Sequence, residues 1–228
     1  MKGLYHMMGL AAAFCLMFVV LITSVEAVVY FNDGYFEKEY TKYQVTERVW
    51  MEMDDLLTVT EEMMAYLRGD REDLVVETVV DGEKREFFNE KEKRHMVDVQ
   101  GLFIGAERLR LAAAALAVIL MGILLGKKQS MALLRMLQWG IGLFLGAMAG
   151  LILLASANFT KYFTWFHLIF FDNDDWILNP KTDLLINIVP EGFFRDTAFL
   201  IAGVFLAASC LLWLSAGILR KKSRKKER

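Results

Sequence analysis

The chain has 228 residues, of which 56% are apolar and 24% are charged, and its formal net charge is −2. The apolar residues are concentrated in four stretches without charges, which lie at 7–25, 111–126, 136–160 and 197–219. Because about 20 apolar residues in a helix cross the bilayer core of roughly 30 Å, we interpret these stretches as membrane spans. This composition excludes a soluble globular protein, a nucleic-acid-binding protein and a secreted disulfide-rich protein.

The first apolar stretch is either a retained membrane anchor or a cleaved signal peptide. Val25-Glu26-Ala27 has the small-residue pattern of a cleavage site. However, the 19 residues of this stretch exceed the usual apolar region of a signal peptide, which has about 7–15 residues. We therefore expect it to be the first membrane span.

The segment that follows, 30–108, has the pattern of a small folded domain. Aromatic residues at steps of three and four between Tyr35 and Tyr43 predict a helix that begins after an Asp-Gly turn. Two short helices are expected next, and Thr58 with Glu61 is interpreted as a capping box for the second of them.

A β-hairpin and a longer helix are expected to complete this segment. The Asp-Gly pair at 81–82 lies between two strand-like runs and is a strong two-residue hairpin signal. Asn89 with Glu92 predicts a capping box at the start of a helix that passes through His95 toward the second span.

Basic residues predict the orientation in the membrane. The connection between the second and third spans carries Lys127, Lys128 and Arg135 without an acid, and the tail 220–228 is strongly basic. Such short basic segments stay in the cytoplasm. Both termini are therefore expected inside and the two long connections outside, the first of which holds 21 acids against 12 lysines and arginines between residues 26 and 110.

Three glycines, Gly142, Gly146 and Gly150, repeat every four residues in the third span. A nucleotide-binding loop is excluded because no strand precedes them and the spacing is wrong. We interpret them as a close helix-packing face, directed at Gly122 and Gly126 of the second span.

The second outer connection, 159–195, is unusually aromatic. Ten of the 36 residues between 159 and 194 are Phe, Tyr or Trp, which a solvated connection would not need. Asp183 is placed to cap a short helix that begins at Leu184. We expect this loop to lie in the membrane interface and to enclose something polar, because His167 and several aspartates lie among its aromatic residues.

The predicted fold class is an α-helical integral membrane protein with four transmembrane helices, N-in and C-in, and a small extracellular α+β cap. The expected division of the chain is spans at 7–29, 109–126, 136–158 and 196–219, the cap at 30–108, a cytoplasmic hairpin at 127–135, the aromatic extracellular loop at 159–195 and the basic cytoplasmic tail at 220–228.

Two of the three histidines, His95 and His167, are the candidate reactive groups. Each falls in one of the two outer segments, whereas His6 precedes the first span. A single histidine is more often structural. The pair carries more information, because neither cysteine falls in these segments and the chain contains no serine-hydrolase elbow, zinc-binding helix motif or phosphate-binding glycine loop. A zinc site built from both histidines and a carboxylate has no motif spacing to support it, so we expect no metal and no cofactor.

Two blocks of residues surround these histidines. The first block is Arg94-His95-Met96-Val97-Asp98-Val99, and the second is Phe166-His167-Leu168-Ile169-Phe170-Phe171, followed by Asp175-Trp176, Asn179-Pro180, Asp183-Leu184 and Pro190-Glu191-Gly192-Phe193-Phe194. Both blocks resemble the bacterial lipoprotein intramolecular transacylase (Lit) family, and the layout of four spans with an outer cap is similar along the whole chain.

The resemblance implies a defined reaction in the bacterial cell membrane, with the active site on the extracellular side. In this family an acyl chain moves from the sn-2 ester of a lipoprotein's S-diacylglyceryl cysteine to the α-amine of the same cysteine, which gives the lyso form. The implied partners are a diacylglyceryl lipoprotein and membrane lipid, with no nucleotide and no nucleic acid.

For this chemistry His95 and His167 are the candidate catalytic residues, one as the base and the other as the acid or oxyanion donor. Asp98, three residues after His95, and Asp175 are candidates to orient them. The candidate residues for binding substrate and lipid are aromatic: Phe166, Phe170, Phe171, Trp176, Phe193 and Phe194.

A shared site requires the two histidines to lie close together. A straight helix would lift His95 roughly 21 Å above the start of the second span, at about 1.5 Å per residue. We therefore expect a bend at Gly101 or Gly105, or a loop that raises His167 into the cap.

Two other functions are compatible with the residues alone. A non-enzymatic accessory or receptor subunit would explain the cap and the aromatic residues but not the pair of histidines. A lipid-ester hydrolase would use the same pair to activate water, and its product would be free fatty acid.

Overall fold

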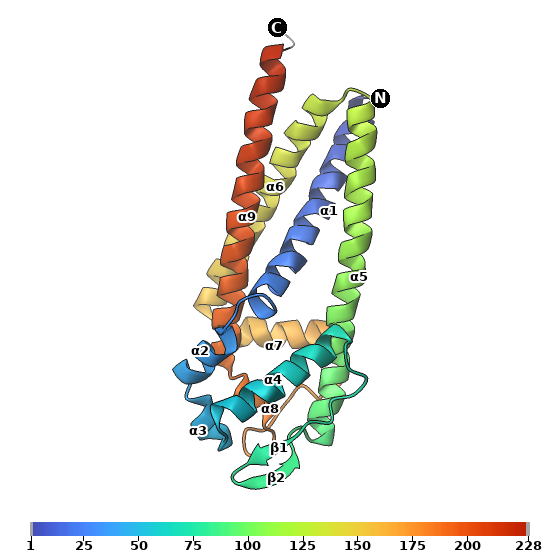
Figure 1. Ribbon diagram of the computed structural model, residues 1–228. Coiled ribbons are helices and arrows are strands. Elements are labelled where there is room, and N and C mark those ends of the chain that lie inside the picture. Colours follow the sequence, from blue (N-terminus) through green and yellow to red (C-terminus); the bar gives the residue numbers. More distant parts are fainter. Residues whose placement is uncertain (1, 227–228) are drawn as a thin grey trace. The chain divides into compact units, whose positions relative to one another are not determined.

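The computed structural model describes residues 2–226, and these residues form mainly helices (Figure 1). Their order along the chain is α1 (Lys2–Val29), α2 (Tyr35–Lys42), α3 (Val45–Val49), α4 (Met53–Arg68), β1 (Glu77–Val80), β2 (Glu83–Glu86), α5 (Glu90–Gly126), α6 (Ser130–Ala157), α7 (Phe159–Phe170), α8 (Leu185–Ile188) and α9 (Glu191–Lys226).

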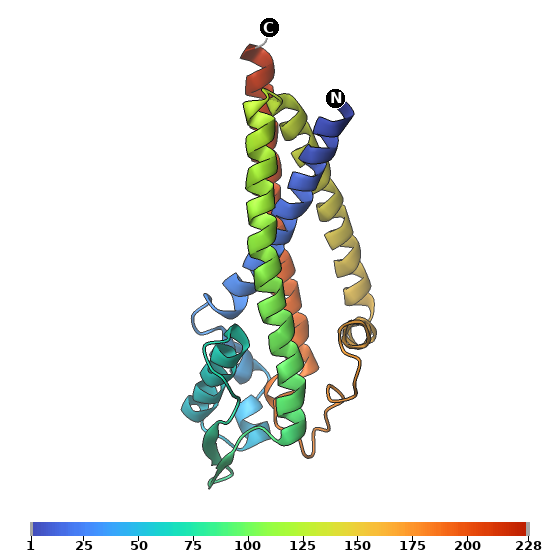
Figure 2. The same ribbon diagram turned by 90° about the vertical axis from the view of Figure 1, so that its right-hand side faces the viewer.

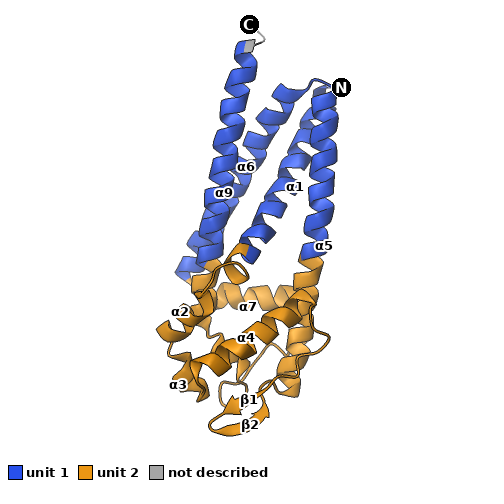
Figure 3. Cartoon of the chain, in the orientation of Figure 1, with its two compact units in different colours: residues 1–26, 107–157, 199–228 blue, residues 27–106, 158–198 orange. Residues whose placement is uncertain are grey.

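The chain divides into two compact units, which are coloured separately in Figure 3. The transmembrane unit comprises residues 1–26, 107–157 and 199–228, and the cap unit comprises residues 27–106 and 158–198. Among the described residues, four helices are long and apolar enough to cross a membrane, namely α1, α5, α6 and α9. The protein is therefore an α-helical membrane protein with a small two-stranded sheet.

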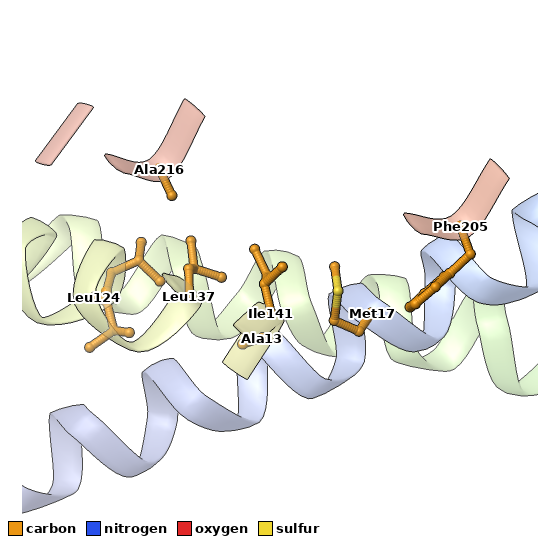
Figure 4. Packing of buried hydrophobic residues seen from close by; sticks show 8 residues of the cluster. Ala13, Met17, Leu124, Leu137, Ile141, Phe205 and Ala216 are labelled. Atoms are coloured by element: carbon orange, nitrogen blue, oxygen red, sulfur yellow. The ribbon is translucent and has the colours of Figure 1, made fainter. Parts of the chain in front are cut away.

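The transmembrane unit is a bundle of α1, α6, α9 and the C-terminal part of α5. The start of α1, the turn between α5 and α6 and the end of α9 lie at the same end of this bundle (Figures 1 and 2). Its core is apolar, and all four helices contribute to it (Figure 4): Ala13, Met17, Leu124, Leu133, Leu137, Ile141, Phe205 and Ala216. At the opposite end of the bundle, where α5 enters the transmembrane unit, Arg110 pairs with Glu26 and, at 2.8 Å, with Glu107.

Small residues bring α1 and α6 into close contact. A Cβ atom on Gly140 would lie 2.4 Å from the Cβ of Ala13, and one on Gly9 would lie 2.9 Å from the Cβ of Met136. Any larger residue at either glycine would force the two helices apart.

The predicted packing of the glycine repeat in α6 against α5 is wrong. A Cβ atom on Gly146 or Gly150 would meet nothing within 4 Å, and the same holds for Gly122 and Gly126 of α5. A Cβ on Gly142 would approach only Trp213 of α9, at 4.0 Å. A spacing of four residues identifies a face of small residues, but it does not identify the helix that covers that face.

The predicted turns of the cap unit are confirmed where the backbone requires a left-handed residue. Helix α2 begins at Tyr35 after Gly34, whose φ is +70°. Strands β1 and β2 pair in antiparallel register across Asp81 and Gly82, whose φ values are +52° and +75°. These positive values are typical of a type I′ hairpin turn.

The predicted capping box at Thr58 is wrong. Helix α4 already begins at Met53, where Asp54 and Asp55 occupy the first turn, in which carboxylates stabilise the helix dipole. The Oγ1 of Thr58 donates instead to the carbonyl of Asp54, at 2.9 Å, within the helix.

The segment 159–195 is only partly a loop, because its first third forms helix α7. The side chain of Asn158 caps this helix by accepting a hydrogen bond from the backbone N–H of Lys161 at 3.1 Å. The predicted cap at Asp183 is wrong, because α8 has no side-chain cap and the Asp183 carboxylate accepts from the backbone N–H of Asn179 at 2.7 Å.

Candidate active site

The two outer histidines lie side by side within the cap unit. His95 lies in the first turns of α5, and His167 lies near the end of α7, which runs across the cap unit toward α5 in Figure 1. Their ring centroids are 6.1 Å apart, and each residue is only 7% exposed. Helix α5 continues as one helix through Gly101 and Gly105, and its ribbon has no sharp bend in Figures 1 and 2, so the expected bend is not what brings the histidines together. Helix α7 brings His167 to His95 instead.

The tautomer of His167 follows from its hydrogen bond. Its Nδ1 lies 2.7 Å from the carbonyl oxygen of Phe163, one helical turn earlier in α7. A carbonyl can only accept, so Nδ1 carries the hydrogen and Nε2 of the neutral ring has a free lone pair. Burial lowers the pKa of His167, and the hydrogen bond to Phe163 opposes that shift. His167 is therefore neutral at pH 7 and can accept a proton at Nε2.

His95 lies in a more apolar environment. The edge of its ring meets Phe171, with centroids 5.2 Å apart, and its buried Nδ1 has no hydrogen-bond partner among the described residues. Burial, with a smaller contribution from the nearby His167, lowers the pKa of His95 to about 4, although Asp98 and Asp175 oppose this shift. The ring is therefore neutral at pH 7. His95 lies in the N-terminal part of α5, which precedes the apolar stretch 111–126.

The low pKa of His95 predicts that the protein loses stability in mild acid. The unfolded chain binds the proton near pH 6.5, whereas folded His95 resists it down to about pH 4. The contribution of neutral His95 to the free energy of unfolding is therefore fully present above pH 6.5 and is lost as the pH falls toward 4. We expect this loss to be about 2 kcal/mol between pH 7 and pH 5. Unfolding in detergent at both pH values measures this loss, and His95→Gln should remove most of it. An equal loss in His95→Gln would assign the effect to other groups.

The two candidate orienting carboxylates do not hydrogen-bond to a histidine. The Oδ2 of Asp98 accepts a hydrogen bond from the side-chain amide of Asn173 at 2.8 Å. Asp175 accepts two hydrogen bonds from the guanidinium of Arg94, at 3.0 and 2.9 Å, and this cation lowers the pKa of the Asp175 carboxyl. These hydrogen bonds attach the segment 173–175 to α5 at Arg94 and Asp98, which come before and after His95 in the sequence.

The fastened segment places aromatic rings on both imidazoles. Trp176, the next residue, stacks on His167 with centroids 4.8 Å apart and planes inclined by 29°. Phe171 lies 5.2 Å from His95 and 5.5 Å from His167, so it contacts both rings. We call residues 171–176 the strap, because this segment begins at Phe171, which contacts both histidines, and ends at Trp176, which stacks on His167.

The other candidate aromatic residues take different positions. Phe166 packs on His167 at 5.5 Å and on Phe170 at 4.7 Å. Phe194 contacts Phe163 at 5.1 Å, and Phe193 packs among the rings of α2 rather than on a histidine. Phe163 is a further residue of the site that was not predicted: its ring centroid lies 4.4 Å from that of His167, and its position one turn before His167 has meaning only in a helix.

A buried carboxylate anchors the start of α5. Glu92 is 1% exposed and accepts the backbone N–H of Asn89 at 2.7 Å, while the Asn89 side chain accepts the N–H of Glu92 at 3.0 Å. These two hydrogen bonds form the predicted capping box. Glu92 also accepts the N–H of Leu185 at 2.6 Å, a long-range contact that the sequence does not indicate. Burial raises the pKa of the Glu92 carboxyl.

The site is therefore a pair of neutral imidazoles in an aromatic enclosure, and the described residues hold no cluster of three or more His, Cys, Asp or Glu side chains that could bind a metal ion. The family sequence model described as lipoprotein intramolecular transacylase Lit matches residues 10–194, which is most of the chain and includes both histidines. The chain belongs to the Lit family. No curated protein matches the chain.

Solved structures agree with this membership at the level of the fold. The membrane-integral lipoprotein intramolecular transacylase Lit from Bacillus cereus is similar over 99% of this chain and 100% of its own, with a TM-score of 0.80 and 23% identity. A single-residue variant of the same Bacillus cereus protein is similar over 98% of this chain and 96% of its own, with a TM-score of 0.77 and 24% identity.

Membership of the Lit family makes the protein a membrane-integral acyltransferase, a lipoprotein intramolecular transacylase. Lipoproteins and membrane lipid are accordingly its partners. The two other functions that the residues allowed, a non-enzymatic subunit and a lipid-ester hydrolase, are not those of this family.

Proposed function

We propose that the enzyme transfers the sn-2 acyl chain of an S-diacylglyceryl cysteine to the α-amine of that cysteine, with His95 and His167 as the catalytic pair. The observation that carries this proposal is the pair of buried, neutral imidazoles 6.1 Å apart, one of which has its base-competent nitrogen free. Both reacting groups belong to one substrate, so the enclosure mainly has to orient them, and orientation can contribute roughly 7–11 kcal/mol.

The histidines take separate roles. The amine attacks the ester carbonyl, and Nε2 of His167 accepts the proton that the amine loses. The tetrahedral intermediate then expels the glyceryl oxygen, and His167 returns the same proton to it, so that an amide and a free sn-2 hydroxyl result. His95 donates from Nε2–H to the oxyanion, because its buried Nδ1 has no acceptor for a hydrogen and is better left as a bare lone pair.

The aromatic enclosure supports transfer over hydrolysis. Trp176, Phe171, Phe166 and Phe163 surround the imidazole of His167, and their rings leave little room for a competing water molecule. Conversion of an ester to an amide is energetically downhill, so the reaction needs no nucleotide.

The reaction itself is tested by the products in cells. Lipoprotein N-termini from a bacterial host with and without this gene are compared by mass spectrometry. We expect the lyso form, N-acylated and with one remaining glyceryl ester, only when the gene is present, at an unchanged total of acyl chains. Release of free fatty acid with loss of one acyl chain would contradict transfer.

The assigned roles predict different results for glutamine at the two positions. The side-chain amide of glutamine donates a hydrogen bond but is not a base at neutral pH. His95→Gln should therefore retain roughly ten-fold or more activity over His95→Ala, because one oxyanion donor contributes about 10²–10³-fold. His167→Gln should be no better than His167→Ala. Initial rates of lyso-form production measure both pairs, and rescue at His167 alone would reverse the assignment.

We place the cap unit and the active site on the extracellular side, with both termini in the cytoplasm. The described basic residues of the transmembrane unit support this orientation, because they are concentrated in the α5–α6 turn and the end of α9. The side of α7 that contains Leu168 and Ile169, which are 63% and 75% exposed, supports a position at the membrane surface.

This orientation predicts which introduced cysteines react from outside the cell. Glu62→Cys in α4 should be labelled on intact cells by a membrane-impermeant thiol reagent, whereas Ser223→Cys at the end of α9 should react only after lysis. The native Cys15 and Cys210 lie within membrane-crossing helices, and the unmodified protein gives their background. Equal labelling of both variants on intact cells would contradict the orientation.

A further inference from the structure

The transmembrane unit contains a groove that the acyl transfer does not use. It lies between α6 and the C-terminal half of α9, and its volume is about 690 Å³, within the range of about 300–1,000 Å³ that is common for small-molecule sites. Trp139 and Gly142 line it from α6, and Trp213, Gly217, Arg220 and Lys221 line it from α9.

The groove is open beside the tryptophans at Gly142, whereas at Gly217 the side-chain amide of Gln138 occupies the space, 2.6 Å from where a Cβ atom would lie. A Cβ atom on Gly142 would have only the Nε1 of Trp213 near it, at 4.0 Å, so this position is open. The Trp213 ring is fixed by a hydrogen bond from its Nε1 to the carbonyl of Gln138, at 3.2 Å. Trp139 and Trp213 are 65% and 41% exposed, so both present apolar surface along the groove.

One end of this apolar groove is positively charged without compensation. Arg220 and Lys221 form no ion pair with any described residue. The parts of the transmembrane unit at 111–157 and 199–226 contain no Asp or Glu. The acids of its remaining described parts, Glu26 and Glu107, pair with Arg110 at the other end of the bundle.

We infer that this groove binds an anionic phospholipid. The phosphate of the lipid is held by Arg220 and Lys221, and one acyl chain lies along the tryptophans and past the open position at Gly142, between α6 and α9. Basic pockets between membrane helices hold anionic headgroups in this way. A zwitterionic lipid fits less well, because the groove has no carboxylate to balance its ammonium group. A second copy of this chain would bring the same positive charge to the groove and be repelled.

Lipid titration of the purified full-length protein tests the charge in this site. Native mass spectrometry in detergent compares phosphatidylglycerol with phosphatidylcholine of the same acyl chains. We expect tighter binding of phosphatidylglycerol, and the double substitution Arg220→Gln with Lys221→Gln should weaken it by about 30-fold. The matched control, Arg224→Gln with Lys225→Gln, removes the same charge from the same helix outside the groove and should leave binding unchanged.

A second pair of variants tests the shape of the site. Gly142→Leu fills the open groove and should abolish the preference for phosphatidylglycerol. Gly150→Leu places the same side chain on the same helix outside the groove, where a Cβ atom meets nothing within 4 Å, and should retain the preference. Equal binding of both lipids, an equal loss in the Arg224/Lys225 control, an unaffected Gly142→Leu protein, or a dimer in place of a lipid adduct would each overturn the inference.

Discussion

Replacing either His95 or His167 with alanine is expected to reduce lyso-form production by roughly 10²–10⁴-fold, the contribution of a positioned acid or base. His167→Ala removes the Nε2 lone pair that receives the amine proton, and His95→Ala removes the oxyanion donor beside it. Because the two imidazoles act on one tetrahedral intermediate, the double variant should be no slower than the slower single variant. Mass spectrometry of a purified diacylglyceryl lipoprotein, incubated with each enzyme, measures the rates.

The third histidine provides a matched control. His6→Ala changes the same residue type in α1, within the transmembrane unit, and should leave the rate unchanged. Thermal unfolding of all variants at pH 7 separates loss of catalysis from loss of fold. A His167→Ala enzyme with normal activity, or a double variant whose loss equals the product of the two single losses, would show that the histidines do not share one site.

The parts of the fold that were predicted correctly depend on local rules. The four membrane helices follow from uninterrupted apolar length, and the hairpin at Asp81-Gly82 follows from the positive φ values that its turn requires. The capping box of Asn89 and Glu92 involves two residues three apart, so neighbouring residues alone define it. In each case residues that are close in the sequence determine the element, so contacts with distant parts of the chain are not required to predict it.

The incorrect predictions concern choices that distant contacts decide. The segment from Phe159 is an exception, because it was interpreted as a loop although Phe159, Phe163, Phe166 and Phe170 step by four, three and four residues, and it forms α7 with Asn158 as its cap. Asp183 has the composition of a helix cap, but Asn89, 94 residues earlier, and Asn179 use its carboxylate. The glycine repeat of α6 likewise could not show which helix would cover it.

The candidate site was only partly accessible to sequence reasoning for the same reason. The pair of histidines was identified from residue type and from the absence of other reactive groups in the outer segments. The roles of Asp98 and Asp175 were not identified, because each carboxylate binds across the contact between α5 and the strap: Asp98 of α5 binds Asn173, and Asp175 of the strap binds Arg94. A carboxylate three residues from a histidine on a helix is equally able to bind either the histidine or a neighbouring segment.

Trp176→Ala is expected to alter the products as well as the rate. The indole stacks on His167, so its loss leaves the imidazole free to move, and a misplacement of about 1 Å can cost on the order of 10²-fold in rate. The vacated space lies beside the base and is large enough for water. Water activated by His167 would then attack the ester, and free fatty acid should appear as a by-product that the unmodified enzyme does not release.

Trp165→Ala is the matched control for this change. Trp165 lies in α7, two residues before His167, is 50% exposed and packs against Tyr162 rather than against the imidazole. Its removal deletes the same side chain near the same site but leaves the rings around His167 in place, so both the rate and the product ratio should be close to those of the unmodified enzyme. Quantification of free fatty acid and lyso-lipoprotein from one incubation gives the ratio of hydrolysis to transfer. If Trp176→Ala slows transfer without releasing fatty acid, the indole positions His167 but does not exclude water. If Trp165→Ala gives the same fatty acid release, the effect belongs to the exposed surface of α7 and not to the stack on His167.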